Sequence, residues 1–292
     1  MVAAVKKTRL ILEMIKFEHT IFAMPFALIS ALLASRQTAH GLSAINLLWI
    51  VLAMIGARSA AMAFNRLADV EFDKANPRTA GRHIPAGLLS KTQVWAFFAI
   101  SVGIFEFAAW KLNTLCLLLS PIALAAILGY SYTKRFTSLC HLFLGFAIGI
   151  APVGAWIAVT GRFALVPLLL GAVVMLWIGG FDIIYALQDY DFDVRSTLFS
   201  LPKRLGKPRA LFTSRLMHFA AVVLLVLVAI LSGLHLLAYV GIGIATLLIA
   251  WEQSLVKPED ISRVNLAFFT LNGWVSISLF FFVWLDLLFN HA

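Results

Sequence analysis

The sequence has few charged residues, few cysteines, and no two-residue alternation of apolar and polar side chains. Only 13% of its 292 residues are Asp, Glu, Lys or Arg, whereas 62% are apolar, and the mean hydropathy is +0.94. A soluble domain of this size does not have such a composition. The missing alternation excludes an outer-membrane β-barrel, because barrel strands place every second side chain in lipid.

The two cysteines, Cys116 and Cys140, are too few for a disulfide framework or a cysteine-based metal site. His19, His218 and His235 are scattered along the chain, without the spacing of metal ligands. We therefore interpret both thiols as small apolar side chains of the interior.

Long apolar runs make up most of the chain. Each run has about 20 residues and can cross a hydrocarbon core of about 30 Å as a helix. We expect an all-α integral membrane protein with nine transmembrane helices around a central cavity, in a single domain over residues 1–292. The first run is expected to be an uncleaved helix, since eight more follow it. The expected spans are 17–34, 44–66, 91–110, 113–132, 138–158, 164–186, 210–232, 234–254 and 265–289.

The net charge of +9 follows the expected topology. With nine spans, 19 of the 23 Lys and Arg residues fall on the side of the membrane that holds the N-terminus. Arg36, Lys111 and Arg162 fall on the other side, and Arg58 lies inside a span. Positive charge marks the cytoplasmic side, so we expect a cytoplasmic N-terminus. The basic excess is first a topology signal, and no nucleic-acid partner is expected.

Two connections on the cytoplasmic side are long, at about residues 65–91 and 187–209. They follow the second and sixth spans, and each begins with an acidic motif. This layout predicts two four-helix halves with corresponding loops, followed by a ninth helix.

The first motif opens the stretch NRLADVEFDKANPRTAGRHIPAG, residues 65–87. At about 100° per residue, Arg58, Asn65 and Asp69 point within about 40° of one another on a helix. Asp73 departs from Asp69 by about 40° more. The first three therefore share one helical face, and Asp73 can reach the same site if the helix frays there.

The second motif ends the sixth span in the stretch GFDIIYALQDYDFDVRSTLFSLPKRLG. Asp182, Tyr185, Asp189 and Asp193 point within about 80° of one another on a helix. Asp191 points elsewhere, so we do not place it in the same site.

The two motifs hold seven of the fourteen acidic residues in the chain. Crowded carboxylates repel each other unless a cation joins them. Mg²⁺ prefers one or two carboxylates together with phosphate oxygens, so two facing motifs could hold a magnesium diphosphate. The competing interpretation is a pair of ordinary hydrated loops. Cations on the same side, suited to phosphate oxygens, are Arg78, Arg82, Lys134, Arg135, Lys203 and Arg204.

Arg58 lies about two helical turns inside its span. A buried guanidinium costs at least about 2.5–3.5 kcal/mol, so it needs a partner or a hydrated cavity. Asp182 lies at a similar depth in the sixth span and is a candidate partner. Structural pairing without chemistry is the alternative.

These residues resemble the UbiA family of intramembrane aromatic prenyltransferases over nearly the whole chain. The residues Asn65, Asp69 and Asp73 look like its first aspartate motif, and the second motif matches from Asp182 to Asp193. Arg58 stands where the family often has Arg. NPRTAGRHIPAG resembles the loop after the first motif, and YSYTKRFT, residues 130–137, resembles the basic end of the fourth helix.

The resemblance implies Mg²⁺-dependent transfer of a polyprenyl group from a polyprenyl diphosphate to an aromatic acid at the membrane. It assigns the metals to Asp69, Asp73, Asp189 and Asp193. Substrate binding is implied for Asn65, Arg78, Arg82, Lys134 and Arg135. Catalytic roles toward the acceptor or the ring proton are implied for Arg58, Asp182 and Tyr185.

LFSLP, residues 198–202, resembles a bacterial subset of the family, although Thr197 stands where that subset usually has Gly. This subset implies a bacterial inner membrane and 4-hydroxybenzoate as acceptor in ubiquinone synthesis. A hydroxynaphthoate of menaquinone synthesis is the alternative acceptor, and Arg58 suits both because both carry a carboxylate. Haem, a chlorin or a glycerol lipid are further acceptors.

A secondary transporter is the alternative from another functional class. Transporters keep their ionisable groups near the middle of the bilayer. Most acidic residues of this chain cluster instead at the cytoplasmic rim, which favours the enzyme.

Overall fold

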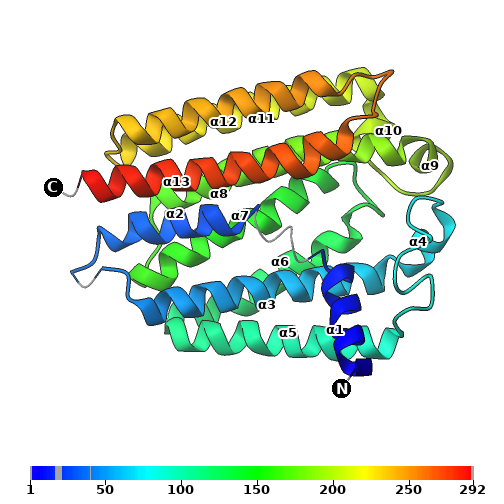
Figure 1. Ribbon diagram of the computed structural model, residues 1–292, viewed down its shortest axis with the longest axis horizontal. Helices are drawn as coiled ribbons and strands as arrows, with labels where there is room; N and C mark the ends of the chain where they lie inside the picture. Colours follow the sequence, from blue (N-terminus) through cyan, green and yellow to red (C-terminus); the bar gives the residue numbers. More distant parts are fainter. Residues whose placement is uncertain (1, 17–21, 40, 291–292) are drawn as a thin grey trace.

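The structure is a computed structural model that describes residues 2–16, 22–39 and 41–290, and these form a bundle of helices (Figure 1). The helices are α1 (Val2–Met14), α2 (Met24–Ser35), α3 (Ala44–Ala68), α4 (Val70–Ala75), α5 (Lys91–Leu112), α6 (Thr114–Thr133), α7 (Cys140–Thr160), α8 (Leu165–Ala186), the 3₁₀-helix η2 (Leu187–Asp189), α9 (Tyr190–Arg195), α10 (Leu201–Leu205), α11 (Lys207–Leu231), α12 (Leu236–Leu255), the π-helix η3 (Leu266–Leu271) and α13 (Asn272–Phe289).

Eight helical segments in the described part of the chain are long and apolar enough to cross a membrane. They agree within a few residues with eight of the nine expected spans, except that the segment Leu165–Arg195 passes the expected end at residue 186 because it includes η2 and α9. The expected first span, 17–34, differs because α2 has only 12 residues and is a shorter apolar helix. Residues 17–21 of that span lie outside the described residues. The all-α membrane architecture is confirmed, and the count of nine stays a prediction.

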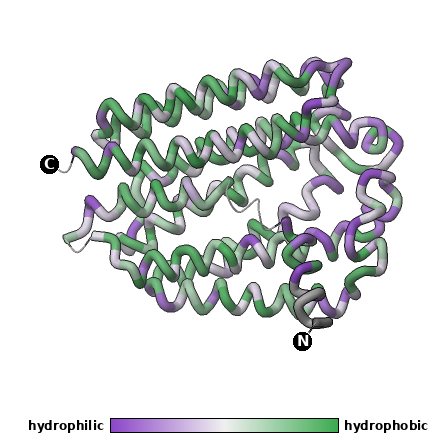
Figure 2. The backbone as a smooth tube through the Cα atoms, viewed as in Figure 1, coloured by the Kyte–Doolittle hydropathy of each residue, from purple (hydrophilic) through white to green (hydrophobic). Residues whose placement is uncertain are grey.

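Large apolar side chains cover the outside of the long helices. Leu236, Leu247 and Phe219 are each at least 70% exposed. In water such a surface would be unfavourable, whereas lipid tails solvate it. Figure 2 shows apolar residues along the bundle and polar residues gathered at the end that carries α4, α9 and α10.

Successive long helices of the chain pack together, whether a short or a long connection joins them. The pairs α3 with α5, α7 with α8, and α8 with α11 are adjacent, and α2 packs against α7 and α13 (Figure 1). The helix α2 therefore joins the first half of the bundle to the second half and to the last helix.

The α7–α8 contact depends on glycine. A Cβ atom on Gly149 would lie 2.5 Å from the carbonyl oxygen of Gly171, and one on Gly145 would lie 2.1 Å from that of Met175. Small residues let membrane helices approach closely where no hydrophobic force drives them together. This close packing fixes α8, which carries the second acidic motif, against the start of α7.

Candidate functional site

The two acidic motifs have the same backbone geometry. Asp69 follows α3 with φ −98° and ψ 6°, and the six-residue helix α4 follows it. Asp189 ends η2 with φ −98° and ψ 3°, and the six-residue helix α9 follows it. The aspartates four residues further on, Asp73 and Asp193, are buried with 5% and 7% exposure. The repeat that the sequence layout predicts is present as local structure.

The segment after α4 connects the two motifs. Arg78 donates through Nε to Oδ1 of Asp189 at 2.7 Å, and a second guanidinium nitrogen contacts Oδ2. Asn76 donates to the same Oδ1 at 2.8 Å. Arg78 also donates to the Tyr185 hydroxyl at 3.1 Å. These contacts bring the end of α3 and the end of α8 together.

The first motif has cations of its own. Asp69 accepts a hydrogen bond from the amide of Asn65 at 3.0 Å and lies 3.7 Å from Arg135. Asp73 Oδ1 accepts from Arg82 at 2.6 Å. The other oxygen, Asp73 Oδ2, is buried and has no hydrogen-bond partner among the described residues. A buried carboxylate oxygen in this state favours a cation.

Burial also affects Asp69. It raises the pKa of this carboxyl above its ordinary value, and Asp73 adds to the effect, while Lys134 and Arg135 oppose it. Burial and the neighbouring carboxylate thus disfavour the ionised form of Asp69, which a bound cation would favour.

Lys134, just after α6, is shared by both motifs. Burial lowers its pKa, but the neighbouring Tyr130 and Asp69 outweigh that effect and hold the pKa above its ordinary value. The ammonium group is therefore charged. The acidic residues with which it interacts electrostatically are Asp69, Asp182, Asp189 and Asp193.

Lys203 and Arg204 make other contacts. The Lys203 ammonium donates to the carbonyl oxygens of Ser196 and Leu198, each at 2.8 Å. Arg204 donates to the Ser138 hydroxyl at 3.1 Å. Both cations hold the turn around α10, and the structure gives them no contact with the acidic motifs.

The candidate pairing of Arg58 with Asp182 is not found among the described residues. Arg58 donates to the carbonyl oxygens of Ile15 and Lys16, at 3.2 and 3.0 Å, and so holds the end of α1. Asp182 instead bonds to Nδ1 of His141 at 2.6 Å. His141 could not be found from the sequence, because a single histidine at the start of an apolar span carries no spacing signal.

The donor set fits magnesium without a complete protein cage. No group of three or more His, Cys, Asp or Glu residues within the described ranges could hold a metal ion alone. Magnesium needs only one or two carboxylates when phosphate and water oxygens supply the rest. The motif aspartates are hard oxygen donors, and Asp73 Oδ2 has no partner among the described residues. The residues fit a metal that arrives with a phosphorylated ligand.

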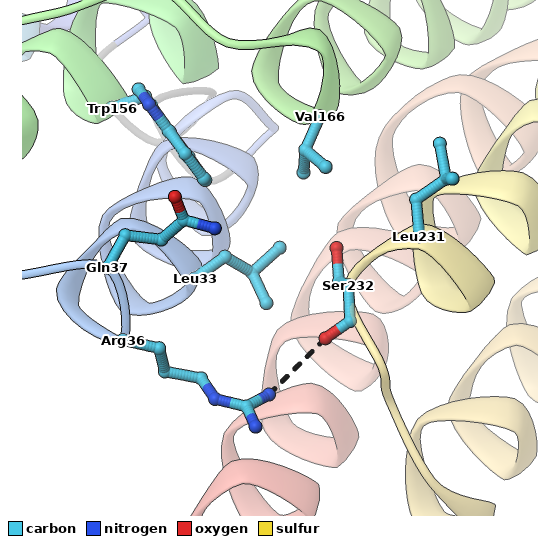
Figure 3. Close-up of a pocket in the computed structure, with 7 residues that line it drawn as sticks. All are labelled: Leu33, Arg36, Gln37, Trp156, Val166, Leu231 and Ser232. Carbon is cyan, nitrogen blue, oxygen red and sulfur yellow. Dashed lines mark hydrogen bonds between the residues drawn. The ribbon is translucent and has the colours of Figure 1, made fainter.

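A separate cavity of about 280 Å³ lies away from the acidic motifs, where α2 and α11 end (Figure 3). Apolar side chains line it together with Arg36, Gln37 and Ser232. Arg36 donates to the Ser232 carbonyl at 3.3 Å. None of the described residues that line this cavity is acidic, so it is not part of the candidate site.

Comparison with known proteins identifies a family that matches almost the full length of the chain. The model of the UbiA prenyltransferase family matches residues 23–284. A 4-hydroxybenzoate octaprenyltransferase of Enterobacter sp. (strain 638) is 31% identical over 223 residues, which is 76% of each chain.

Two solved structures have the same fold. The apo structure of a UbiA homolog from Aeropyrum pernix K1 is 37% identical with a TM-score of 0.84, covering 92% of this chain and 98% of that one. A UbiA homolog from Archaeoglobus fulgidus, bound to GPP and Mg²⁺, is 18% identical with a TM-score of 0.69, covering 95% and 99%. The chain belongs to the UbiA prenyltransferase family.

Proposed function

We propose that this protein transfers a polyprenyl group from a polyprenyl diphosphate to 4-hydroxybenzoate, with Mg²⁺ as cofactor. The observation that carries the proposal is the contact between the two acidic motifs through Arg78 and Asn76. The similarity to 4-hydroxybenzoate octaprenyltransferases supports 4-hydroxybenzoate as the acceptor. The Archaeoglobus fulgidus homolog bound to GPP and Mg²⁺ supports Mg²⁺ as the cofactor and a prenyl diphosphate as the donor.

Asp69, Asp73, Asp189 and Asp193 would hold the metal, with Asn65 assisting through its bond to Asp69. When bound, magnesium supplies positive charge to a diphosphate leaving group. The remaining charge would come from cations already held near the carboxylates, because preorganised charge stabilises a leaving group at little reorganisation cost. These cations are Arg78, Arg82, Lys134 and Arg135.

The reaction breaks the allylic C–O bond, and its electron pair leaves with the diphosphate. The allylic carbon then bonds to a ring carbon of the acceptor, and the ring loses one proton. We propose that Asp182 takes this proton or orients the acceptor, and that Arg58 recognises the acceptor carboxylate. The Tyr185 ring would stabilise the allylic cation, next to the Phe268 ring at a centroid distance of 4.2 Å.

We infer that the site faces the cytoplasm of a bacterial inner membrane. The basic residues that follow α4 and α6 lie at the same end as the motifs, as the positive-inside rule requires. The water-soluble acceptor and diphosphate would then enter from the cytoplasm, and the isoprenoid tail would extend into lipid.

The proposal is tested with purified protein in detergent, geranyl diphosphate, Mg²⁺ and a set of aromatic acids. The expected product, identified by mass spectrometry, is geranylated 4-hydroxybenzoate, and it requires Mg²⁺. If only a hydroxynaphthoate is prenylated, the reaction type stands and the proposed acceptor is wrong. No product from any acceptor, with protein that stays folded, would contradict the proposal.

A further inference from the structure

His141 is almost completely buried, at 1% exposure, and lies in the first turn of α7. Its Nδ1 lies 2.6 Å from Oδ2 of Asp182 on α8. Its Nε2 accepts a hydrogen bond from the backbone N–H of Leu201 at 3.3 Å. A backbone N–H can only donate, so Nε2 carries no proton and Nδ1–H donates to the carboxylate. The two contacts together fix the tautomer of the ring.

The bond to His141 leaves Asp182 with one oxygen occupied. Oδ1 has no hydrogen-bond partner among the described residues, and the side chain is 20% exposed. The carboxylate also interacts with Lys134, which serves both motifs. Asp182 therefore has one oxygen fixed by the protein and one that remains able to contact a substrate.

We propose that His141 is a positioning residue that orients Asp182 for the aromatic acceptor. This inference rests on the proposed function, because it deepens the role given there to Asp182. A carboxylate on a single Cα–Cβ bond rotates unless a donor holds it, and a short charge-assisted hydrogen bond is strong enough to do so. Loss of the donor lets Asp182 rotate away from the ring that it must contact.

The second contact of His141 ties Asp182 to the segment after the second motif. Leu201 begins α10, and the preceding residue, Ser200, interacts with Asp193. The neighbouring Cys140 donates through its thiol to the Phe199 carbonyl. The start of α7 thus holds this segment and the side chain of Asp182 in one arrangement.

A buried histidine is often only part of the interior, and His218 is such a case. It is 2% exposed, and its ring bonds to the Trp177 carbonyl and to Gln253. Neither partner is an acid of the two motifs. His218 therefore serves as a matched control for the loss of a buried imidazole.

The activity test compares H141L, H141Q and H218Q. Leucine removes both polar atoms, whereas glutamine restores one donor and one acceptor. We expect H141L to lower kcat/KM for the acceptor by about 10- to 100-fold, with the KM for the prenyl diphosphate within about twofold. H141Q should recover most of that loss, and H218Q should leave the acceptor KM unchanged.

The double variant H141L/D182N should be no worse than D182N alone, because a positioning residue acts only through its partner. Additive losses, or equal losses for the acceptor and the prenyl diphosphate, would overturn the proposal. A wild-type protein that prenylates no acceptor would instead overturn the proposed function.

The contact itself is tested without turnover. In protein labelled with ¹⁵N-histidine, NMR should detect a proton on Nδ1 of His141, with a shift that changes in D182N and a signal that is absent in H141Q. A proton on Nε2 instead, or a signal unaffected by D182N, would contradict the inference whether or not the enzyme is active.

Discussion

The two acidic motifs have the same backbone but receive their cations differently. Asp69 and Asp189 have the same φ and nearly the same ψ, and a six-residue helix follows each. The segment after the first motif supplies Arg82 to Asp73 and Arg78 to Asp189. Among the described residues, the cations of the segment after the second motif do not bond to these aspartates, and its Lys203 donates instead to backbone carbonyl oxygens. The repeat thus duplicates the acids, while one connection provides arginines for both.

The largest expected loss of activity follows substitution of Asp69 or Asp189, which hold equivalent positions in the two motifs. D69N and D189N should each lower the rate of geranyl transfer on the order of 10³-fold, since each removes a charge that both halves of the site need. Asp191 is the matched control, because it lies in the second motif but is exposed. D191N should stay within about twofold of the wild type. If the rate of geranyl transfer falls by less than tenfold in D69N or D189N, the two motifs are not equivalent in function.

The next largest effect is expected at Lys134, which both motifs share, and it should be absent at Lys203, which follows the second motif. K134Q should raise the KM for geranyl diphosphate and lower kcat/KM by about 100-fold, because Lys134 interacts with both motifs. K203Q should leave that KM unchanged and lower the unfolding temperature, because it removes two bonds to carbonyls. Reversed effects on the KM would mean that the loop after the second motif contributes to phosphate binding.

Substitution of the two arginines after the first motif, Arg78 and Arg82, should lower kcat/KM to different extents. Arg78 donates two hydrogen bonds to Asp189 of the other motif and one to Tyr185, whereas the Arg82 side chain donates to Asp73 of its own motif. We expect kcat/KM to fall by about 10- to 100-fold in R78Q and less in R82Q. Steady-state kinetics at saturating Mg²⁺ measure both, and a larger loss in R82Q would contradict the bridging role of Arg78.

The smallest effect is expected at Asn76. Its amide donates to Asp189 and accepts from the backbone N–H of Arg78, so it fixes the turn that directs Arg78 across the site. N76A should lower kcat/KM by roughly fivefold, since Arg78 still reaches the carboxylate through two nitrogens. Combined with R78Q, the loss should be less than the product of the two, because both act on one carboxylate.

Much of the fold could be predicted, because span length and hydropathy are local properties of the chain. The helix period predicts one face for Arg58, Asn65 and Asp69, whereas in the structure α3 ends at Ala68 and a new helix follows Asp69. The contact between the motifs was an expectation from charge, and the bonds of Arg78 to Asp189 and Tyr185 now give it a geometry.

The remaining contacts depend on tertiary structure. The depth of Arg58 and Asp182 suggested a pair, but which helices face each other decides the partner, and Asp182 binds His141 instead. Lys203 is one of the cations that the sequence places on the side of the motifs, but a turn can direct a side chain back to its own carbonyls, as it does here. The roles assigned to the motif residues remain predictions.

The central claim is that both motifs bind one diphosphate together. Calorimetric titration of a geranyl diphosphate analogue that cannot ionise, with and without Mg²⁺, tests it most directly in the wild type, D69N and D189N. We predict Mg²⁺-dependent binding with one site per chain, lost or strongly weakened in both variants. Binding of wild-type strength in either variant would show that one motif suffices, and would contradict the account.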